Sequence, residues 1–339
     1  MSQRVWGNKE TEFFYDLTPD KVLNAIEQAL DVRCTGRCFQ LNSMENRVYE
    51  IEIELDHEPE DPSERFVVAK FYRPGRWTKA QIEDEHEFLA ELDENDIPVV
   101  APYVNAAQES VFTMPISGLF FAVFPKQGGR CPDELSDEQM TQAGRLLARM
   151  HNIGAMHKAD HRIELNPETY GLQNLEFLLS SDLIPPELRQ AYESVVKGIC
   201  QHIAPLFAKV KPQRLHGDCH IGNLLVGRQG MFWVDFDDMV MGPPVQDLWL
   251  LIPGRDAYGR AKQEKLLSGY ETMRAFPMES LALIEPLRAL RYVHFAAWIG
   301  KRWHDPAFPR AFPYYGTMKY WQEQLLDLRE QHALILDTN

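Results

Sequence analysis

Apolar and polar residues alternate along the first third of the chain in the manner of half-buried strands. The stretch CFQLNSMENRVYEIEIEL at 38–55 predicts two strands joined by a turn. The apolar run RFVVAKFY at 65–72 predicts a third strand with buried character, and SVFTMPISGLFFAVFP at 110–125 predicts two shorter ones. This part of the chain should therefore form a small sheet.

Helical spacing takes over in the rest of the chain. Thr18 and Pro19 before 21–30 predict a capped helix, and the acidic segment 78–96 predicts an amphipathic helix that ends before Ile97 and Pro98. Helical spacing then covers three longer segments, 133–154, 184–210 and most of 262–335. Between the two regions, Lys126 to Arg130 read KQGGR, which is typical of a linker. We expect an α+β protein of two lobes, 1–125 and 126–339.

Composition narrows the class of protein. A chain of 339 residues with 45% apolar residues is long enough to bury a core in each lobe. Its 35 basic and 50 acidic residues give a net charge of −15, which disfavours nucleic acid as the main partner because phosphate binding needs a basic face. Five scattered cysteines indicate a reducing compartment. With no signal-like N-terminus and no long apolar run, we expect a cytoplasmic monomer without a membrane partner.

Polar residues gather in RLHGDCHIGNLL at 214–225 and return in MFWVDFDD at 231–238. The apolar runs 224–226 and 231–236 flank two glycines and predict a hairpin, which would bring Asp235 back beside Asn223. Amide and carboxylate oxygens are the ligands that Mg²⁺ uses, usually together with substrate phosphates. Asp218, set apart from this pair, is a candidate base.

These two stretches resemble the catalytic and metal-binding loops of the kinase-like phosphotransferases, whose loop reads H-G-D-x-H-x-x-N. Further stretches, LNSMENRVYEIE, VVAKFYRPGRWT, FAVFPKQGGR and GPPVQDLWLL, make the chain similar to the bacterial stress response kinase A family from about residue 18 to about 325. The resemblance implies a bilobal protein kinase-like fold, with an antiparallel sheet and helix in the N-terminal lobe and a mainly helical C-terminal lobe. It also implies an ATP- and Mg²⁺-dependent serine/threonine protein kinase of a stress response, able to phosphorylate itself.

The resemblance implies that Asp218 is the catalytic base and that Asn223 and Asp235 hold Mg²⁺. Asp235 is therefore expected to be both a metal ligand and a catalytic residue. Lys70, near the end of its strand, would contact the ATP phosphates and pair with Glu85 on the next helix. Asp237 is an alternative second metal contact. Neighbouring residues of a helix lie about 100° apart, so Glu83 and Asp84 should point away from Lys70.

The chain has no Gly-rich phosphate motif of the G-x-G-x-x-G or Walker type. The equivalent turn is 41–46, where Ser43 and backbone N–H groups could bind a phosphate, although a plain hairpin turn is the alternative. At the interlobe hinge, the Pro125 carbonyl and the Gln127 N–H are the candidate contacts for adenine. Asp247 resembles the aspartate with which the family braces its catalytic loop.

Several alternatives stay open at this point. His216 and His220 could bind zinc, although bracing of the loop is the simpler hypothesis. The segment 288–303 is interpreted as a core helix, with a cation-binding aromatic box as the alternative. For the whole chain, the alternatives to a protein kinase are a small-molecule hydroxyl kinase and a nucleotide-binding regulator without turnover.

Overall fold

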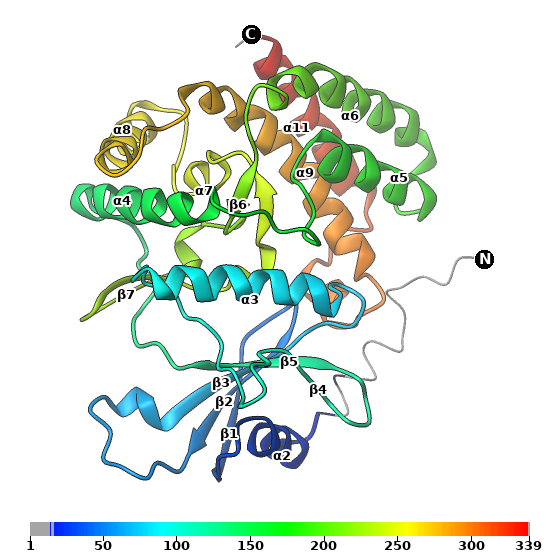
Figure 1. The fold of residues 1–339 in the computed structure, drawn as a ribbon. Helices are drawn as coiled ribbons and strands as arrows, with labels where there is room; N and C mark the ends of the chain where they lie inside the picture. Colours follow the sequence, from blue (N-terminus) through cyan, green and yellow to red (C-terminus); the bar gives the residue numbers. More distant parts are fainter. Residues whose placement is uncertain (1–13, 15–16, 338–339) are drawn as a thin grey trace. The chain divides into compact units, whose positions relative to one another are not determined.

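The computed structural model describes Phe14 and residues 17–337, and within this part the chain forms two compact units (Figure 1). The N-terminal unit comprises Met1–Glu134 and Ile221–Asp237. The helical unit comprises Leu135–His220 and Asp238–Asn339. A short segment after residue 220 thus rejoins the first unit. The lobe boundary at residue 125 stays a prediction.

The N-terminal unit is built on the predicted antiparallel sheet. Its strand order is β1-β2-β3-β5-β4, and the strands are β1 (Cys34–Leu41), β2 (Arg47–Ile53), β3 (Phe66–Phe71), β4 (Phe112–Thr113) and β5 (Phe120–Pro125). Every neighbouring pair in this sheet is antiparallel. β1 begins four residues before the predicted strand, because Cys34 pairs with Ile53 at the end of β2 across a register shift between Cys34 and Cys38.

The N-terminal unit also contains the helices α2 and α3. α2 (Pro19–Leu30) begins after Thr18, as predicted, but the Thr18 side chain makes no capping hydrogen bond. Its carbonyl accepts the Val22 N–H at 3.0 Å instead. α3 (Lys79–Glu94) begins with a full capping box between Thr78 and Gln81, which satisfies two exposed backbone N–H groups of the first turn.

The predicted hairpin is confirmed as β7 (Leu224–Gly227) and β8 (Gly230–Trp233). Arg130 and Val226 exchange backbone hydrogen bonds of 3.0 and 2.9 Å, and Trp233 N–H donates to the Pro98 carbonyl at 3.1 Å. These bonds attach the hairpin to the rest of the N-terminal unit. The residues at its two ends are therefore positioned by that unit.

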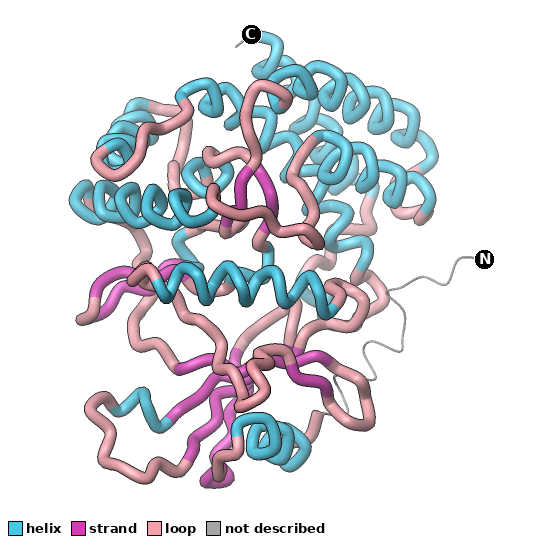
Figure 2. Tube along the Cα trace, in the orientation of Figure 1, coloured by secondary structure: helices cyan, strands magenta, loops and turns pink. Residues whose placement is uncertain are grey.

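The helical unit is mainly α-helix, as Figure 2 shows. Its helices are α4 (Asp137–Gly154), α5 (Gln173–Ser180), α6 (Pro186–Phe207), α7 (Gln246–Trp249), α8 (Ala257–Glu271), α9 (Ile284–Lys301), α10 (Ala307–Ala311) and α11 (Met318–Asp337). Two three-residue strands, β6 (Gln213–Leu215) and β9 (Val240–Gly242), pair antiparallel beside them. In the part of the chain that the structure describes, no helix combines the length and apolarity needed to span a bilayer.

Candidate functional site

Lys70 lies in β3 of the N-terminal unit, with its ammonium surrounded by carboxylates. Its Nζ is 3.6 Å from Glu85 Oε1, 3.4 Å from Asp235 Oδ1 and 3.0 Å from Asp237 Oδ1. The side chain of Lys70 is only 10% exposed. Strand β3, helix α3 and the segment after the hairpin therefore bring one cation and three anions together.

The carboxylates around Lys70 keep its side chain protonated. Burial by itself lowers the pKa of the ammonium, but the carboxylates of Asp237 and Glu85, followed by Tyr72 and Asp235, raise the pKa well above its ordinary value. The side chain is therefore a fixed positive charge in a low-dielectric setting. Such a charge can hold phosphate oxygens in place once they displace a carboxylate.

Helix α3 presents Glu85 to Lys70 for a simple geometric reason. Ile82, Glu85 and Leu89 follow one another at intervals of three and four residues and share the buried face of the helix. Glu85 is 1% exposed, whereas Glu83 is exposed. The Lys70–Glu85 ion pair expected from the resemblance is thus present in the geometry. A buried carboxylate without that cation would be costly.

The turn between β1 and β2 contains Ser43, whose Oγ accepts the Asn46 N–H at 3.2 Å. Arg73 holds the same turn from the end of β3. Its Nε donates to the Glu45 carbonyl at 3.0 Å and its terminal nitrogen to the Met44 carbonyl at 3.2 Å. The turn is therefore braced by a buried guanidinium rather than by glycines. Contact between Ser43 and a phosphate stays a prediction.

Asn46, Arg76 and Asp237 link this turn to the segment that carries Asp235, and the sequence reasoning missed the roles of the first two. Asn46 Nδ2 donates to Asp237 Oδ2 at 3.2 Å, and its Oδ1 accepts the Arg73 N–H at 3.0 Å. Arg76 pairs with the same Asp237 oxygen. The signal was available, because these residues stand in the quoted stretches LNSMENRVYEIE and VVAKFYRPGRWT.

Asn223 and Asp235 end up beside each other across the base of the hairpin, as predicted. The Val234 N–H donates to the Asn223 carbonyl at 3.0 Å, which places Asp235 one residue from that bond. Asp235 has a positive φ of 62° and a side chain that is 57% exposed. Its carboxylate is therefore open to an incoming ligand.

The described residues contain no group of three or more His, Cys, Asp or Glu side chains that could hold a metal ion. A site made of Asn223 and Asp235 offers only two protein ligands. It does suit Mg²⁺, which commonly takes one or two protein ligands and completes its shell with phosphates and water. The residues therefore fit a divalent cation that arrives with a nucleotide, whereas their metal-binding role stays a prediction.

The hinge candidates lie at the end of β5. Pro125 is the last residue of that strand and pairs with Val67 of β3. Gln127 donates its side-chain amide to the Gly128 carbonyl at 3.2 Å and lines a pocket of about 440 Å³. The hairpin residues 226–229 line the same pocket. Contact between these two residues and adenine stays a prediction.

Asp218 belongs to the helical unit, where its loop follows β6. Asp247 is fully buried beneath the loop and accepts the N–H groups of His216 at 2.9 Å and Gly217 at 2.8 Å. His151 Nε2 contacts the same carboxylate at 3.1 Å. The bracing expected of Asp247 is confirmed. The backbone before Asp218 is consequently held rigidly.

Both oxygens of the Asp218 carboxylate have cationic or potentially cationic neighbours. His220 Nε2 lies 3.3 Å from Oδ2, and Arg291 of α9 lies 3.1 Å from Oδ1. Burial alone raises the pKa of Asp218, but the hydrogen bond with His220 and the charges of Arg291, His220 and His216 bring the pKa down to about 2. Asp218 is therefore ionised at neutral pH. Arg291 was not among the predicted site residues.

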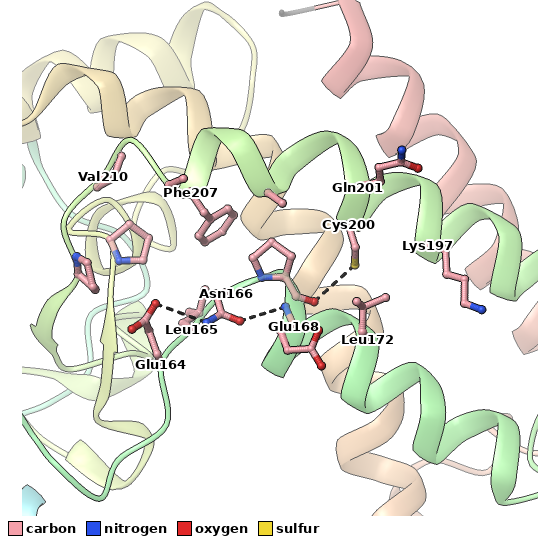
Figure 3. A pocket seen from close by; sticks show the side chains of 15 residues that line it. Glu164, Leu165, Asn166, Glu168, Leu172, Lys197, Cys200, Gln201, Phe207 and Val210 are labelled. Atoms are coloured by element: carbon pink, nitrogen blue, oxygen red, sulfur yellow. Dashed lines mark hydrogen bonds between the residues drawn. The ribbon is translucent and has the colours of Figure 1, made fainter.

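The helical unit also contains a pocket of about 700 Å³ between α6 and the segment 164–172 (Figure 3). Among its lining residues, Asn166 accepts the Glu168 N–H at 3.0 Å and Cys200 donates to the Pro167 carbonyl at 3.5 Å. The predicted site residues, all of which lie in the described part of the chain, do not line this pocket.

Comparisons with known proteins agree with this geometry. The model of the phosphotransferase enzyme family (APH) matches residues 40–284. Stress response kinase A of Escherichia coli strain K12 is 37% identical over 332 residues, covering 97% of this chain and 96% of that protein. A Salmonella typhimurium protein named serine/threonine protein kinase RdoA is 36% identical over 327 residues, covering 95% and 94%.

A solved structure supports the fold. Amicoumacin kinase hAmiN, solved in complex with AMP-PNP, Ca²⁺ and Ami, matches with a TM-score of 0.71 at 19% identity, covering 96% of this chain and 95% of that one. The α+β kinase fold expected from the sequence is thereby confirmed. Because the family model spans most of the chain and these relatives align over nearly all of it, the chain belongs to the phosphotransferase enzyme family, in the group of the stress response kinase A proteins.

Proposed function

We propose that this protein is an ATP- and Mg²⁺-dependent kinase that transfers a phosphoryl group to Ser and Thr hydroxyls of proteins. The observation that carries the proposal is the ammonium of Lys70, which lies within 3.6 Å of Glu85, Asp235 and Asp237. A strand lysine paired with a helix glutamate, next to an exposed metal-binding aspartate, is the constellation that positions triphosphates in kinases.

The charges around Lys70 support a requirement for a divalent cation. Three carboxylates against the Lys70 and Arg76 cations leave this region anionic, which repels a triphosphate. A bound Mg²⁺ would supply Lewis-acid polarisation and neutralise the charge that develops on the phosphoryl oxygens. Asp235 and Asn223 would hold it, while Lys70 orients the phosphates and Glu85 keeps the lysine in place.

Asp218 is the proposed base. Its loop is held by Asp247, and its carboxylate is ionised at neutral pH, so it can orient an acceptor hydroxyl and take its proton. Phosphoryl transfer depends mainly on positioning and charge stabilisation, so one rigidly held carboxylate is sufficient for this part of the reaction.

Relatives support proteins as the acceptors. The Salmonella typhimurium relative named a serine/threonine protein kinase is 36% identical, whereas the solved amicoumacin kinase is 19% identical. That solved kinase is nevertheless the observation that favours a small-molecule hydroxyl kinase as the second candidate. Radiolabelled ATP, offered with the protein itself, generic protein substrates, and a panel of amino alcohols and sugars, separates the two. Label on small molecules alone would overturn the protein kinase proposal.

The substitution Asp218→Asn distinguishes an active kinase from a nucleotide-binding regulator without turnover. The substitution keeps the size of the side chain and removes the base, so phosphoryl transfer should fall by about 10²–10⁴-fold. Nucleotide affinity, measured by titration calorimetry, should be retained because the groups around Lys70 are intact. Absence of ATP turnover in the unsubstituted protein would favour the regulator instead.

A further inference from the structure

Arg291 of α9 lies against the carboxylate of the proposed base. Its guanidinium lies 3.1 Å from Asp218 Oδ1, while His220 holds the other oxygen at 3.3 Å. Both carboxylate oxygens are therefore engaged by donors. Each carboxylate oxygen keeps a second lone pair for the hydroxyl proton, so an acceptor that reaches Oδ1 binds directly beside the Arg291 guanidinium.

We propose that Arg291 is a specificity-determining residue that selects acceptors with an anionic group, a carboxylate or a phosphate, next to the hydroxyl. The anionic group binds the Arg291 guanidinium in place of Asp218 and thereby holds the hydroxyl beside Oδ1. This inference rests on the proposed function, because it takes Asp218 to be the base.

The Arg291 guanidinium can exchange its partner for an incoming anion. Its side chain is 45% exposed, so an incoming anion can reach the guanidinium and take the place of the Asp218 carboxylate. A guanidinium also binds carboxylates and phosphates through two parallel hydrogen bonds. Losing this cation makes Asp218 more basic, which assists proton transfer.

The surroundings on α9 favour an anion over a cation. The helix carries three Arg or Lys residues, Arg288, Arg291 and Lys301, and one acidic residue, Glu285. Glu285 is already paired with Arg255 at 2.6 Å. This basic helix stands out in a chain whose net charge is −15. An acceptor with a cationic group next to its hydroxyl would meet like charge here.

The aromatic cluster of α9 does not offer a free cation box either. Phe295 and Trp298 stack with ring centres 5.6 Å apart, and Phe295 follows Arg291 by four residues, on the same face of the helix. The Arg302 guanidinium already lies over the Trp298 ring, 4.9 Å from its centre. A second cation on these rings would therefore be repelled from Arg302 and Arg291.

Two synthetic peptides test the proposal. They have equal length and one Ser, flanked on both sides by Glu in the first and by Lys in the second. Phosphoryl transfer from radiolabelled ATP gives kcat/KM for each peptide. The unsubstituted protein should prefer the Glu peptide by at least about tenfold, Arg291→Ala should bring the ratio near one, and Arg291→Glu should favour the Lys peptide.

Arg329→Glu is the matched control, because it makes the same charge change at an exposed residue of α11. It should leave the preference for the Glu peptide intact. If Arg291 had only a structural role, Arg291→Glu would lower activity toward both peptides and would not reverse the preference between them. Thermal unfolding of each variant reports whether it is folded.

A further acceptor pair, glycerol 3-phosphate and ethanolamine, separates failure of this inference from failure of the proposed function. Transfer to small molecules alone would overturn the protein kinase proposal, and a preference for glycerol 3-phosphate that Arg291→Glu reverses would still support the role of Arg291. Equal use of both peptides, preference for the Lys peptide, or a ratio unchanged in Arg291→Glu would overturn that role. Absence of any phosphoryl transfer would overturn both.

Discussion

Asp235 and Asp237 are only two residues apart, but their carboxylates have opposite surroundings. Asp235 adopts a left-handed backbone conformation and its side chain is 57% exposed. Asp237 is 5% exposed at its side chain and contacts Lys70, Arg76 and Asn46. We infer that Asp235 is the metal ligand, whereas Asp237 positions the turn and the lysine. The alternative role of Asp237 as a second metal contact is less compatible with this enclosure.

A pair of substitutions separates these roles. Asp235→Asn should raise the Mg²⁺ concentration for half-maximal transfer at least about tenfold, because a charged ligand is lost. Asp237→Asn should instead raise the KM for ATP and leave the Mg²⁺ requirement nearly unchanged, because it loosens Lys70 and Asn46. Magnesium titrations at saturating ATP give both values. Equal shifts in the two Mg²⁺ curves would contradict the assignment.

Lys301 on α9 provides a residue-scale test in stability rather than activity. Burial, and then the charge of Arg302, lower its pKa from 10.5 to about 8, while its ammonium donates to Asn174 Oδ1 at 3.0 Å. Between these two pH values the unfolded chain binds more protons than the folded one. The contribution of Lys301 to the free energy of unfolding therefore rises as the pH rises from 8 to 10.5.

In Lys301→Met this contribution is absent. The stability of the variant relative to the unsubstituted protein should be highest at or below pH 8 and should decline by up to about 3 kcal/mol as the pH approaches 10.5. Urea unfolding at several pH values measures the difference. Lys319→Met, at an exposed lysine of α11, is the control that measures how a lysine-to-methionine change affects the free energy of unfolding at a solvated position. A flat difference between the two variants would contradict the buried setting of Lys301.

At the scale of elements, glycines allow α4 and α8 to cross closely. A Cβ on Gly144 would overlap the Leu266 carbonyl oxygen, and one on Gly269 would overlap the Thr141 carbonyl oxygen. Both obstacles are backbone atoms of the facing helix, which cannot turn aside as a side chain can. The packing of these two helices therefore depends on the missing side chains.

Gly144→Ala should consequently destabilise the protein. Overpacking of this kind costs about 1–3 kcal/mol or more, which outweighs the gain of about 1 kcal/mol in helix propensity. Gly198→Ala on α6 is the matched control, because its Cβ would meet only the His332 ring, at 3.1 Å. Urea midpoints compare the two variants. A midpoint for Gly144→Ala as high as that of Gly198→Ala would show that the helices can separate without cost.

At the scale of the whole molecule, the chain leaves the helical unit after His220 and returns to it at Asp238. The segment between these residues delivers Asn223 and Asp235 to the N-terminal unit, which already carries Lys70 and Glu85. The candidate nucleotide ligands thus share one unit. Asp218 belongs to the other, so nucleotide binding and the proposed base can be tested separately.

Nucleotide and metal should therefore stabilise the fold together. At an ATP concentration about 100 times its dissociation constant, binding adds about 2.7 kcal/mol to the free energy of unfolding. This gain should appear with Mg²⁺, disappear on chelation with EDTA, and be absent in Lys70→Ala. Asp218→Asn should retain it. Denaturant unfolding with and without ATP gives the values. An undiminished gain in EDTA would exclude the proposed metal requirement.

Much of this architecture could be predicted because it depends on local patterns. The strand around Lys70, the helix that carries Glu85 and the hairpin between Asn223 and Asp235 follow from residue spacing and turn residues. The extra residues at the start of β1 escaped prediction because a register shift depends on the pairing strand rather than on the chain's own pattern.

The sequence by itself determined the strands of the N-terminal sheet, the longer helices, their order and the family, because periodicity and short motifs are properties of neighbouring residues. Only the tertiary structure decided that Asp237 is enclosed by Lys70 and Arg76, and that Arg291 lies against Asp218. These partners are separated from one another by more than seventy positions along the chain. Their pairing depends on how distant elements pack. Ion pairs between residues so far apart in the chain produce no periodic pattern in the sequence.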